Sequence, residues 1–328
     1  MAGAGADMSE ADLTPTVITT PRVTATLADT RVGRPRKRLK LKDTWWRHVV
    51  AIAAAVIALF PVVYIVSSAF NADNTIQDAQ VIPTHTTLHN FGALFHNKVV
   101  GTSGGKLDVP YLHWFVNSML VAGLTAIFTT MLGALAAYAF SRFRFKGRRL
   151  GMMTLLLIQM FPQFVAVAAI YLIIYNVGNI FPEIGLNQLA AVIVVYLGGS
   201  MGVQAWLMKG FFDTIPSELD ESARVDGATA AQIFWGVVLP LAAPVLCVVA
   251  LISFVFTLNE FVIASAILQT TGHFTLPVGM QGLISNQYDK VWGPFAAGAL
   301  LAALPVTILF MFLQRWIVSG LTGGAVKG

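Results

Sequence analysis

Six long apolar segments constrain this chain more than any other feature of its sequence. A helix needs about 20 mostly apolar residues to cross the hydrocarbon core of a bilayer. Segments of that length lie at about 47–70, 113–140, 150–175, 187–208, 235–262 and 294–317, and the third is cut by Pro162. Only 11% of the residues are charged, whereas a soluble domain has roughly 25%. The sequence therefore predicts an all-α integral membrane protein with six transmembrane helices.

The distribution of basic residues predicts how these helices are oriented. Cytoplasmic loops of membrane proteins collect Lys and Arg. If the N-terminal segment is cytoplasmic, all but three of the 21 Lys and Arg residues fall on that side, the exceptions being Lys98, Lys106 and Lys290. We therefore expect both termini in the cytoplasm, joined by an even number of spans.

Residues 1–44 differ from the rest, because they are polar and show neither helical nor strand periodicity. We expect a disordered tail there and a transmembrane domain at 45–328. The tail ends in a basic cluster made of Arg31, Arg34, Arg36, Lys37, Arg38, Lys40 and Lys42. Such a cluster can bind nucleic acid, but its place just before an apolar span favours contact with anionic membrane lipid. We expect membrane lipid, and no nucleic acid, as its partner.

A polar island at 216–240 interrupts the apolar pattern. Ser217, followed by Asp220 three residues later, predicts a capping box at the start of a short helix. Asp220 and Arg224 are four residues apart, which predicts an ion pair along that helix. The helix is short enough to be marginal in isolation, because nucleating a helix is costly.

The same island contains a stop signal and a second start signal. Gly227 tolerates the left-handed backbone that ends a helix. Thr229, with Gln232 three residues later, predicts the capping box of a second helix that runs into the fifth apolar segment. The residues alone leave two interpretations open: a solvated loop helix, or a surface that docks on another protein.

The sequence contains no pattern that predicts catalysis by this chain. The P-loop pattern is absent, since the fragment Gly104–Leu107 lacks its spacing and its hydroxyl. Cys247 is the single cysteine, and the six histidines show no metal-site spacing. We therefore expect no catalytic residue, metal or cofactor. Glu260 is the main ionisable residue within the spans, and it is either functional or an interfacial residue.

The polar island also carries a family resemblance. Glu221-Ser222-Ala223, then Gly227, then Val237–Pro240 resembles the EAA motif of the membrane subunits of binding-protein-dependent ABC importers, with Ser222 in place of Ala and Val237 in place of Ile. Further stretches resemble maltose permease subunits of the MalG type: Ala137–Arg142, Gln159–Pro162, Tyr196–Gly199, Trp292–Ala297 and Gln314–Gly328.

This resemblance implies a type I ABC importer permease in the bacterial cell (inner) membrane. Its implied partners are a MalF-like second permease subunit, two ABC ATPase subunits and an extracytoplasmic sugar-binding protein. ATP would be hydrolysed by the ATPase subunits, so the chain itself is not an enzyme. The implied cargo is maltose, maltodextrin or a similar oligosaccharide such as trehalose or cellobiose.

The resemblance also implies roles for individual residues. A coupling helix at about 215–232 would dock on one ATPase through the motif residues Glu221, Ser222, Ala223, Gly227, Leu239 and Pro240. The C-terminal residues Thr322, Gly323, Gly324 and Lys327 would reach between the ATPases. The outer loop with Ser285, Asn286, Gln287 and Tyr288 would contact the binding protein. Most sugar contacts would come from the second permease, so none is assigned to this chain.

Two other function classes remain as alternatives. A secondary transporter would show several buried carboxylates or histidines in its spans, of which Glu260 is the main example here. Asn117, Ser118, Gln159 and Gln163 could line a pathway, but hydrogen bonds between helices explain such residues equally well. The remaining alternative is a membrane receptor or assembly protein that transports nothing.

Overall fold

The computed structural model describes residues 41–72, 85–101, 104–285 and 290–325, without the side chains of 41–44, Gln163 and 317–325. The chain divides into two compact units, 1–55 and 56–328. The predicted tail at 1–44 lies outside the described residues up to position 40, and α1 begins at Leu41.

Most of the described chain is helical. In order, the elements are α1 (Leu41–Phe70), α2 (His89–Phe95), β1 (Lys98–Val100), β2 (Lys106–Asp108), α3 (Tyr111–Arg142), α4 (Arg148–Gln159), α5 (Gln163–Gly178), η1 (Pro182–Ile184), α6 (Leu189–Phe212), α7 (Ser217–Val225), α8 (Ala230–Ile233), η2 (Phe234–Val238), α9 (Leu239–Leu241), α10 (Ala243–Asn259), α11 (Val262–Ile267), η3 (Thr271–His273), α12 (Leu276–Ser285) and α13 (Trp292–Ala325).

Four of these helices are unbroken, long enough and apolar enough to cross a membrane: α1, α3, α6 and α13. Two bent helix pairs in the described chain also qualify, and counting each pair as one span gives six. The first pair, α4 and α5, bends by 100° at Pro162, where the sequence predicts a cut. The second pair bends by 79° between Leu241 and Ala243. The fifth predicted span, at about 235–262, is therefore bent, and Pro244, which has no N–H to donate, sits in the first turn of α10.

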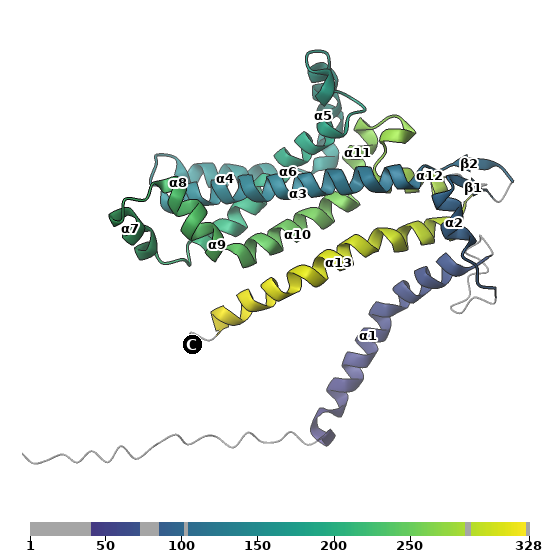
Figure 1. Cartoon of the computed structure of the whole chain (residues 1–328), viewed down its shortest axis with the longest axis horizontal. Helices are drawn as coiled ribbons and strands as arrows, with labels where there is room; N and C mark the ends of the chain where they lie inside the picture. Colours follow the sequence, from purple (N-terminus) through teal and green to yellow (C-terminus); the bar gives the residue numbers. More distant parts are fainter. Residues whose placement is uncertain (1–40, 73–84, 102–103, 286–289, 326–328) are drawn as a thin grey trace, which may run out of the picture. The chain divides into compact units, whose positions relative to one another are not determined.

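In the second unit, α3 packs along α6 and α10 (Figure 1). Small residues and hydroxyls allow this close approach. A Cβ added at Gly133 on α3 would lie 3.2 Å from Gln204 Cβ on α6. The hydroxyls of Thr129 on α3 and Ser253 on α10 lie 3.0 Å apart and share a hydrogen bond. Close approach over small residues and hydrogen bonds between helices are what hold membrane helices together.

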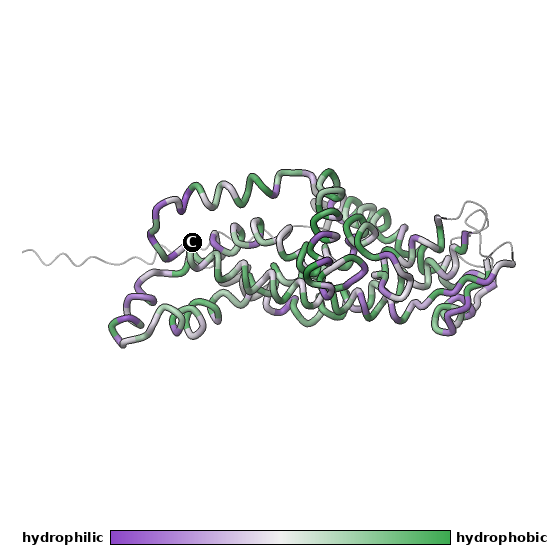
Figure 2. The backbone as a smooth tube through the Cα atoms, turned by 90° about the horizontal axis from the view of Figure 1, so that it is seen from above, coloured by the Kyte–Doolittle hydropathy of each residue, from purple (hydrophilic) through white to green (hydrophobic). Residues whose placement is uncertain are grey.

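Polar residues gather near the two ends of this bundle (Figure 2). One end carries α7, and the opposite end carries α2 with the antiparallel hairpin of β1 and β2 (Figure 1). At the hairpin end, Tyr111 Oη donates a hydrogen bond to the Gly298 carbonyl oxygen at 2.8 Å, and Trp114 Nε1 donates one to the Thr271 carbonyl oxygen at 2.7 Å. These bonds tie the start of α3 to α13 and to the 271–276 segment.

Asn117 and Ser118 belong to the same structural network. Asn117 Nδ2 donates to the carbonyl oxygens of Gly272 and Phe274, each at 3.0 Å, and the Leu276 N–H donates to Ser118 Oγ at 2.6 Å. Of the two interpretations that the sequence left open for these residues, the structure supports the structural one. Gln163 has no described side chain.

Candidate functional site

The polar island folds as α7, a turn and α8, at one end of the bundle (Figure 1). Pro216 is the residue that precedes the first turn of α7, and its φ of −55° and ψ of 132° are extended. Ser217 is already helical, and no side chain caps the start of α7. The predicted capping box of Ser217 and Asp220 is therefore wrong. The capping box does not form because the Asp220 carboxylate is turned toward a different partner.

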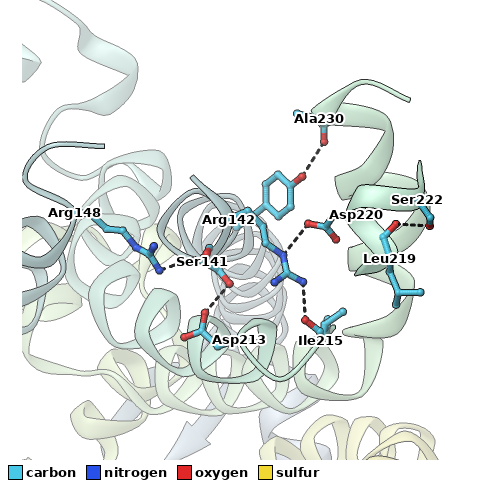
Figure 3. A network of polar contacts seen from close by, with 10 residues as sticks. Ser141, Arg142, Arg148, Asp213, Ile215, Leu219, Asp220, Ser222 and Ala230 are labelled. Atoms are coloured by element: carbon cyan, nitrogen blue, oxygen red, sulfur yellow. Dashed lines mark hydrogen bonds and ion pairs between the residues drawn. The ribbon is translucent and has the colours of Figure 1, made fainter. Parts of the chain in front are cut away.

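That partner is Arg142, the last residue of α3. Arg142 Nε lies 2.9 Å from Asp220 Oδ2, and the two side chains are 9% and 5% exposed. Arg142 Nη2 also donates a hydrogen bond to the Ile215 carbonyl oxygen at 3.0 Å, so the guanidinium points between Asp220 and Ile215 (Figure 3). The predicted Asp220–Arg224 pair is wrong because a shielded guanidinium attracts the carboxylate more strongly than one exposed to water does.

A second set of contacts ties α3 to the end of α6. Ser141 Oγ donates to Asp213 Oδ1 at 2.7 Å, and Lys209 Nζ forms an ion pair with Asp213 Oδ2. Arg148 Nη2 donates to the Ser141 carbonyl oxygen at 3.4 Å (Figure 3). Burial acts to raise the pKa of Asp213, but hydrogen bonds from Lys209 and Ser141, with the charges of Lys209 and Arg148, lower it below its ordinary value.

The predicted stop and restart of the helix are both confirmed. Gly227 has a φ of +84°, and its N–H donates to the Arg224 carbonyl oxygen at 3.0 Å, while the Ala228 N–H donates to the Ala223 carbonyl oxygen at 2.9 Å. These two bonds form the glycine-ended Schellman motif. Thr229 then caps α8 in a full capping box with Gln232.

A third link joins this turn back to α3. Tyr138 Oη donates a hydrogen bond to the Ala230 carbonyl oxygen at 3.3 Å. The Tyr138 ring packs against Phe234 with centroids 5.1 Å apart. The whole α7–α8 element is therefore held on the end of α3 by Arg142 on one side and Tyr138 on the other.

The motif residues divide between the exposed face of α7 and its attachment to the bundle. Glu221 and Ser222 are exposed, and the exposed fraction of Val225 is 88%. Ser222 Oγ donates to the Leu219 carbonyl oxygen at 3.1 Å, so its hydroxyl is bonded within the helix. Glu221 takes part in neither of the ion pairs found in the described part of the chain. We call Glu221, Ser222 and Val225 the open face of α7.

The remaining motif residues face the bundle or continue the chain into the membrane. Ala223 and Leu239 pack against a buried cluster that includes Met208, Phe212 and Phe234. Pro240 is exposed in the short helix α9. Gly227 is exposed at the turn, and no atom lies within 4 Å of a Cβ added there.

Two further groups of predicted site residues fall largely outside the described chain. Ser285 ends α12 and is exposed, whereas Asn286, Gln287 and Tyr288 lie outside the described residues. Thr322, Gly323 and Gly324 belong to the backbone of α13 without described side chains, and Lys327 lies outside the described residues. Their predicted roles remain predictions.

Sequence reasoning did not identify Arg142 and Tyr138 as part of this site. Both lie in the Ala137–Arg142 stretch that carries the family resemblance. The signal available was the position of Arg142 at the predicted cytoplasmic end of a span, beside an island rich in carboxylates. Nothing local distinguished Arg142 from the neighbouring Arg144, which is exposed.

Glu260 has a structural explanation in this geometry. It follows the last residue of α10, and its carboxylate accepts hydrogen bonds from the N–H groups of Ile263 and Ala264 at 2.8 and 3.1 Å, and from the Tyr196 hydroxyl. It thereby caps the start of α11. Among the described residues, no three His, Cys, Asp or Glu side chains cluster closely enough to hold a metal ion.

The family of this chain is identified by comparison with known proteins. Residues 129–323 match the model of the family described as binding-protein-dependent transport system inner membrane components. The chain belongs to this family. Its match covers α7, the turn at Gly227 and the spans on either side, and the family description places its members in the inner membrane.

Individual relatives cover nearly the whole chain. The galactooligosaccharides transport system permease protein GanQ of Bacillus subtilis is 38% identical over 92% of this chain and 100% of its own length. The maltose/maltodextrin transport system permease protein MalG of Vibrio vulnificus is 39% identical over 89% of this chain and 98% of its own length. The sequence-level resemblance to MalG-like sugar permeases is thereby confirmed.

A solved structure shares the fold. A chain of a bacterial ABC transporter involved in the import of the acidic polysaccharide alginate superposes with a TM-score of 0.68 at 20% identity, covering 85% of this chain and 97% of that one. The family match and the permease relatives, with the apolar helices, make the chain a multi-pass membrane permease of a binding-protein-dependent transport system. The relatives are named as permease proteins of transport systems.

Proposed function

We propose that this chain is one of two permease subunits in an ATP-driven importer of maltodextrin-type oligosaccharides. The observation that carries the proposal is the attachment of α7: its open face is exposed, while Asp220 behind it forms an ion pair with Arg142 on α3. If another protein bound to the open face moves, a helix attached in this way moves with it and displaces the membrane span to which it is attached. The names of the MalG and GanQ relatives support an oligosaccharide as cargo.

The mechanism follows from the attachments of α7. An ATPase subunit docks on the open face, with a basic residue opposite Glu221. When two ATPase subunits close on ATP, α7 moves with them, and the links through Arg142 and Tyr138 carry the displacement to α3. Because α3 packs along α6 and α10, these three spans shift together, and access to the pathway changes from the inner to the outer side.

This proposal places the two ends of the bundle on opposite sides of the membrane. The α7 end and both termini lie in the cytoplasm, with six spans and each bent helix pair counted as one. The residues at 322–324 and Lys327 reach between the ATPases. The segment after α12, from Ser285 to Tyr288, meets an extracytoplasmic sugar-binding protein, and a MalF-like second permease completes the pathway.

The sugar itself has two leading candidates. Maltose and maltodextrins are favoured by the MalG relatives, and galactooligosaccharides by GanQ, at nearly equal identity. Trehalose and cellobiose, which like maltose are disaccharides, are further candidates. A secondary transporter is disfavoured, because Glu260, the main ionisable residue within the spans, is engaged in capping the start of α11.

Purification from native membranes in mild detergent, followed by uptake assays in proteoliposomes, tests this function. The chain should co-purify with a second permease and with ABC ATPase subunits. Uptake of labelled maltotriose or a galactotriose should require ATP and the binding protein. Recovery of the chain alone, with uptake driven by an ion gradient, would overturn the proposal.

A charge reversal gives the matched test of the docking face. Glu221→Lys on the open face should release the ATPase subunits or abolish sugar-stimulated ATP hydrolysis. Glu183→Lys, at an exposed carboxylate on η1, makes the same change away from α7 and should have no such effect. Equal ATPase recovery and activity for both variants would count against docking on this face.

A further inference from the structure

A cavity of about 350 Å³ lies between α6 and α10, bordered by the last residue of α4. Ligand pockets have volumes of roughly 300–1,000 Å³. The α6 residues that line the cavity run from Val195 to Leu207, in the middle of the helix. The cavity is therefore positioned at the centre of a predicted span, away from both polar ends of the bundle.

The lining contains a buried polar side chain without a partner. Gln204 on α6 is 7% exposed, and its Oε1 atom has no hydrogen-bond partner in the described chain. A buried acceptor without a hydrogen-bond partner destabilises the fold. A hydrogen-bond donor placed in the cavity would remove that cost, so the cavity favours a polar occupant over a lipid tail.

A second amide reaches the cavity because α4 and α6 lie unusually close together. A Cβ added at Gly202 on α6 would lie 2.7 Å from the Leu155 carbonyl oxygen and 2.9 Å from Gln159 Cγ on α4. With glycine at this position, the Gln159 side chain can lie over α6 at the cavity border. Two amide side chains from different helices therefore line one space.

The other polar groups in the lining differ in how far they are already engaged. The Ser253 hydroxyl bonds to Thr129, and the Glu260 carboxylate bonds to Tyr196 and to the start of α11. Thr257 also lines the cavity, and no hydrogen bond of its hydroxyl is found in the described chain. Phe256 lines the space as well and is 75% exposed, which adds an accessible aromatic surface.

We propose that this cavity is a binding site for the transported oligosaccharide, contributed by this chain itself. The proposal rests on the function proposed above, and it departs from the expectation that the second permease makes most of the sugar contacts. A neutral sugar carries several hydroxyl donors for Gln204, Gln159 and Thr257, and less polar ring faces for Phe256. The Glu260 carboxylate is engaged in capping α11. The lining therefore favours a neutral ligand over an ionic one.

Cysteine labelling in the complete importer tests whether sugar occupies the cavity. Cys247→Ala removes the single native cysteine, and Thr257→Cys then places a thiol in the lining. Maltotriose or a galactotriose, added with the binding protein and ATP, should slow maleimide labelling of this thiol several-fold. Ser265→Cys is the control, because Ser265 is exposed on α11 and outside the lining, and sugar should not change its labelling.

Uptake kinetics provide a second, independent measurement. Gln204→Leu removes the amide and should raise the sugar concentration for half-maximal uptake about three- to tenfold, the loss of about one hydrogen bond. Thr257→Val removes a hydroxyl from the lining and is the second variant, in case the Gln204 variant does not fold. It should change the relative uptake of maltotriose and the galactotriose. Ser265→Ala should leave uptake unchanged.

The outcomes separate this inference from the proposed function. If the unaltered importer takes up neither sugar, the function proposed above is wrong. If it transports one normally while the thiol at position 257 stays unprotected and both cavity variants keep normal kinetics, the cavity is not a sugar site.

Discussion

Arg142 and Asp220 lie on different helices, yet they form an ion pair of 2.9 Å in which both side chains are shielded from water. Breaking a buried pair by removing one partner costs about 3–5 kcal/mol, because the other charge is left uncompensated. We expect Asp220→Asn to lower the thermal stability of the purified subunit and to reduce sugar-stimulated ATP hydrolysis.

The controls for this pair separate the buried interaction from general charge effects. Asp226→Asn changes an exposed carboxylate close to α7 and should alter neither measurement. The double variant Arg142→Met/Asp220→Leu should recover much of the stability, because apolar replacement of a buried pair is often neutral. An Asp220→Asn variant as stable as Asp226→Asn would contradict the importance of the pair.

Gly227 should not tolerate a β-branched residue, although there is space for one. No atom lies within 4 Å of an added Cβ, but the φ of +84° is strained for residues with a side chain, at about 1–3 kcal/mol. Gly227→Val should abolish transport-coupled ATP hydrolysis while leaving membrane insertion intact. Gly227→Asn should be milder.

Gly210 provides the matched control for the backbone at Gly227. It also has no atom within 4 Å of an added Cβ, and it lies in α6 without a positive φ. Gly210→Val should therefore keep coupled ATPase activity. Sugar uptake at the normal rate by Gly227→Val would show that the turn does not transmit movement.

The contact between α4 and α6 predicts different effects for two glycines on one helix. Gly202→Ala would place a methyl group 2.7 Å from the Leu155 carbonyl oxygen, so one helix must shift. We expect a loss of about 1–3 kcal/mol in stability, typical of overpacking. Gly198→Ala meets nothing within 4 Å and should not destabilise. Thermal unfolding in detergent compares the two, and equal stabilities would refute close packing at Gly202.

Asp213 predicts a loss of stability in acid. Its pKa in the folded chain is lowered, so the folded state binds a proton less readily than the unfolded state does. The stabilisation is therefore complete above the unfolded pKa of about 3.9 and is lost as pH falls through the lowered value. The stability difference between the unaltered chain and Asp213→Asn should be constant near neutral pH and shrink below about pH 4. A difference that does not change with pH would contradict this assignment.

The C-terminal residues 322–328 predict an effect on ATPase assembly. Their removal should weaken retention of the ATPase subunits during purification, or reduce sugar-stimulated ATP hydrolysis, if they reach between those subunits. Membrane insertion should be preserved, because the candidate span Trp292–Trp316 lies before the deleted residues. Unchanged sugar-stimulated ATPase activity after the deletion would exclude the role.

Features that depend on a few neighbouring residues could be predicted from the sequence. The turn at Gly227 and the capping box of Thr229 and Gln232 were predicted correctly, because the hydrogen bonds of each are made within a short stretch of neighbouring residues. The apolar segments were likewise recognised by length. The break between Leu241 and Ala243 was not predicted, because hydropathy is continuous through it.

The sequence by itself thus determined the membrane class, the resemblance to importer permeases and the stop and restart of the helix around Gly227. The tertiary structure alone decided which partner Asp220 takes and that Gln204 Oε1 is buried without a partner. Arg224 was the neighbour in sequence, but packing shields Arg142 beside Asp220, and charges attract more strongly where water is excluded. Gln204 became an unpaired acceptor only because α6 and α10 enclose it at the cavity, and no local pattern contains that information.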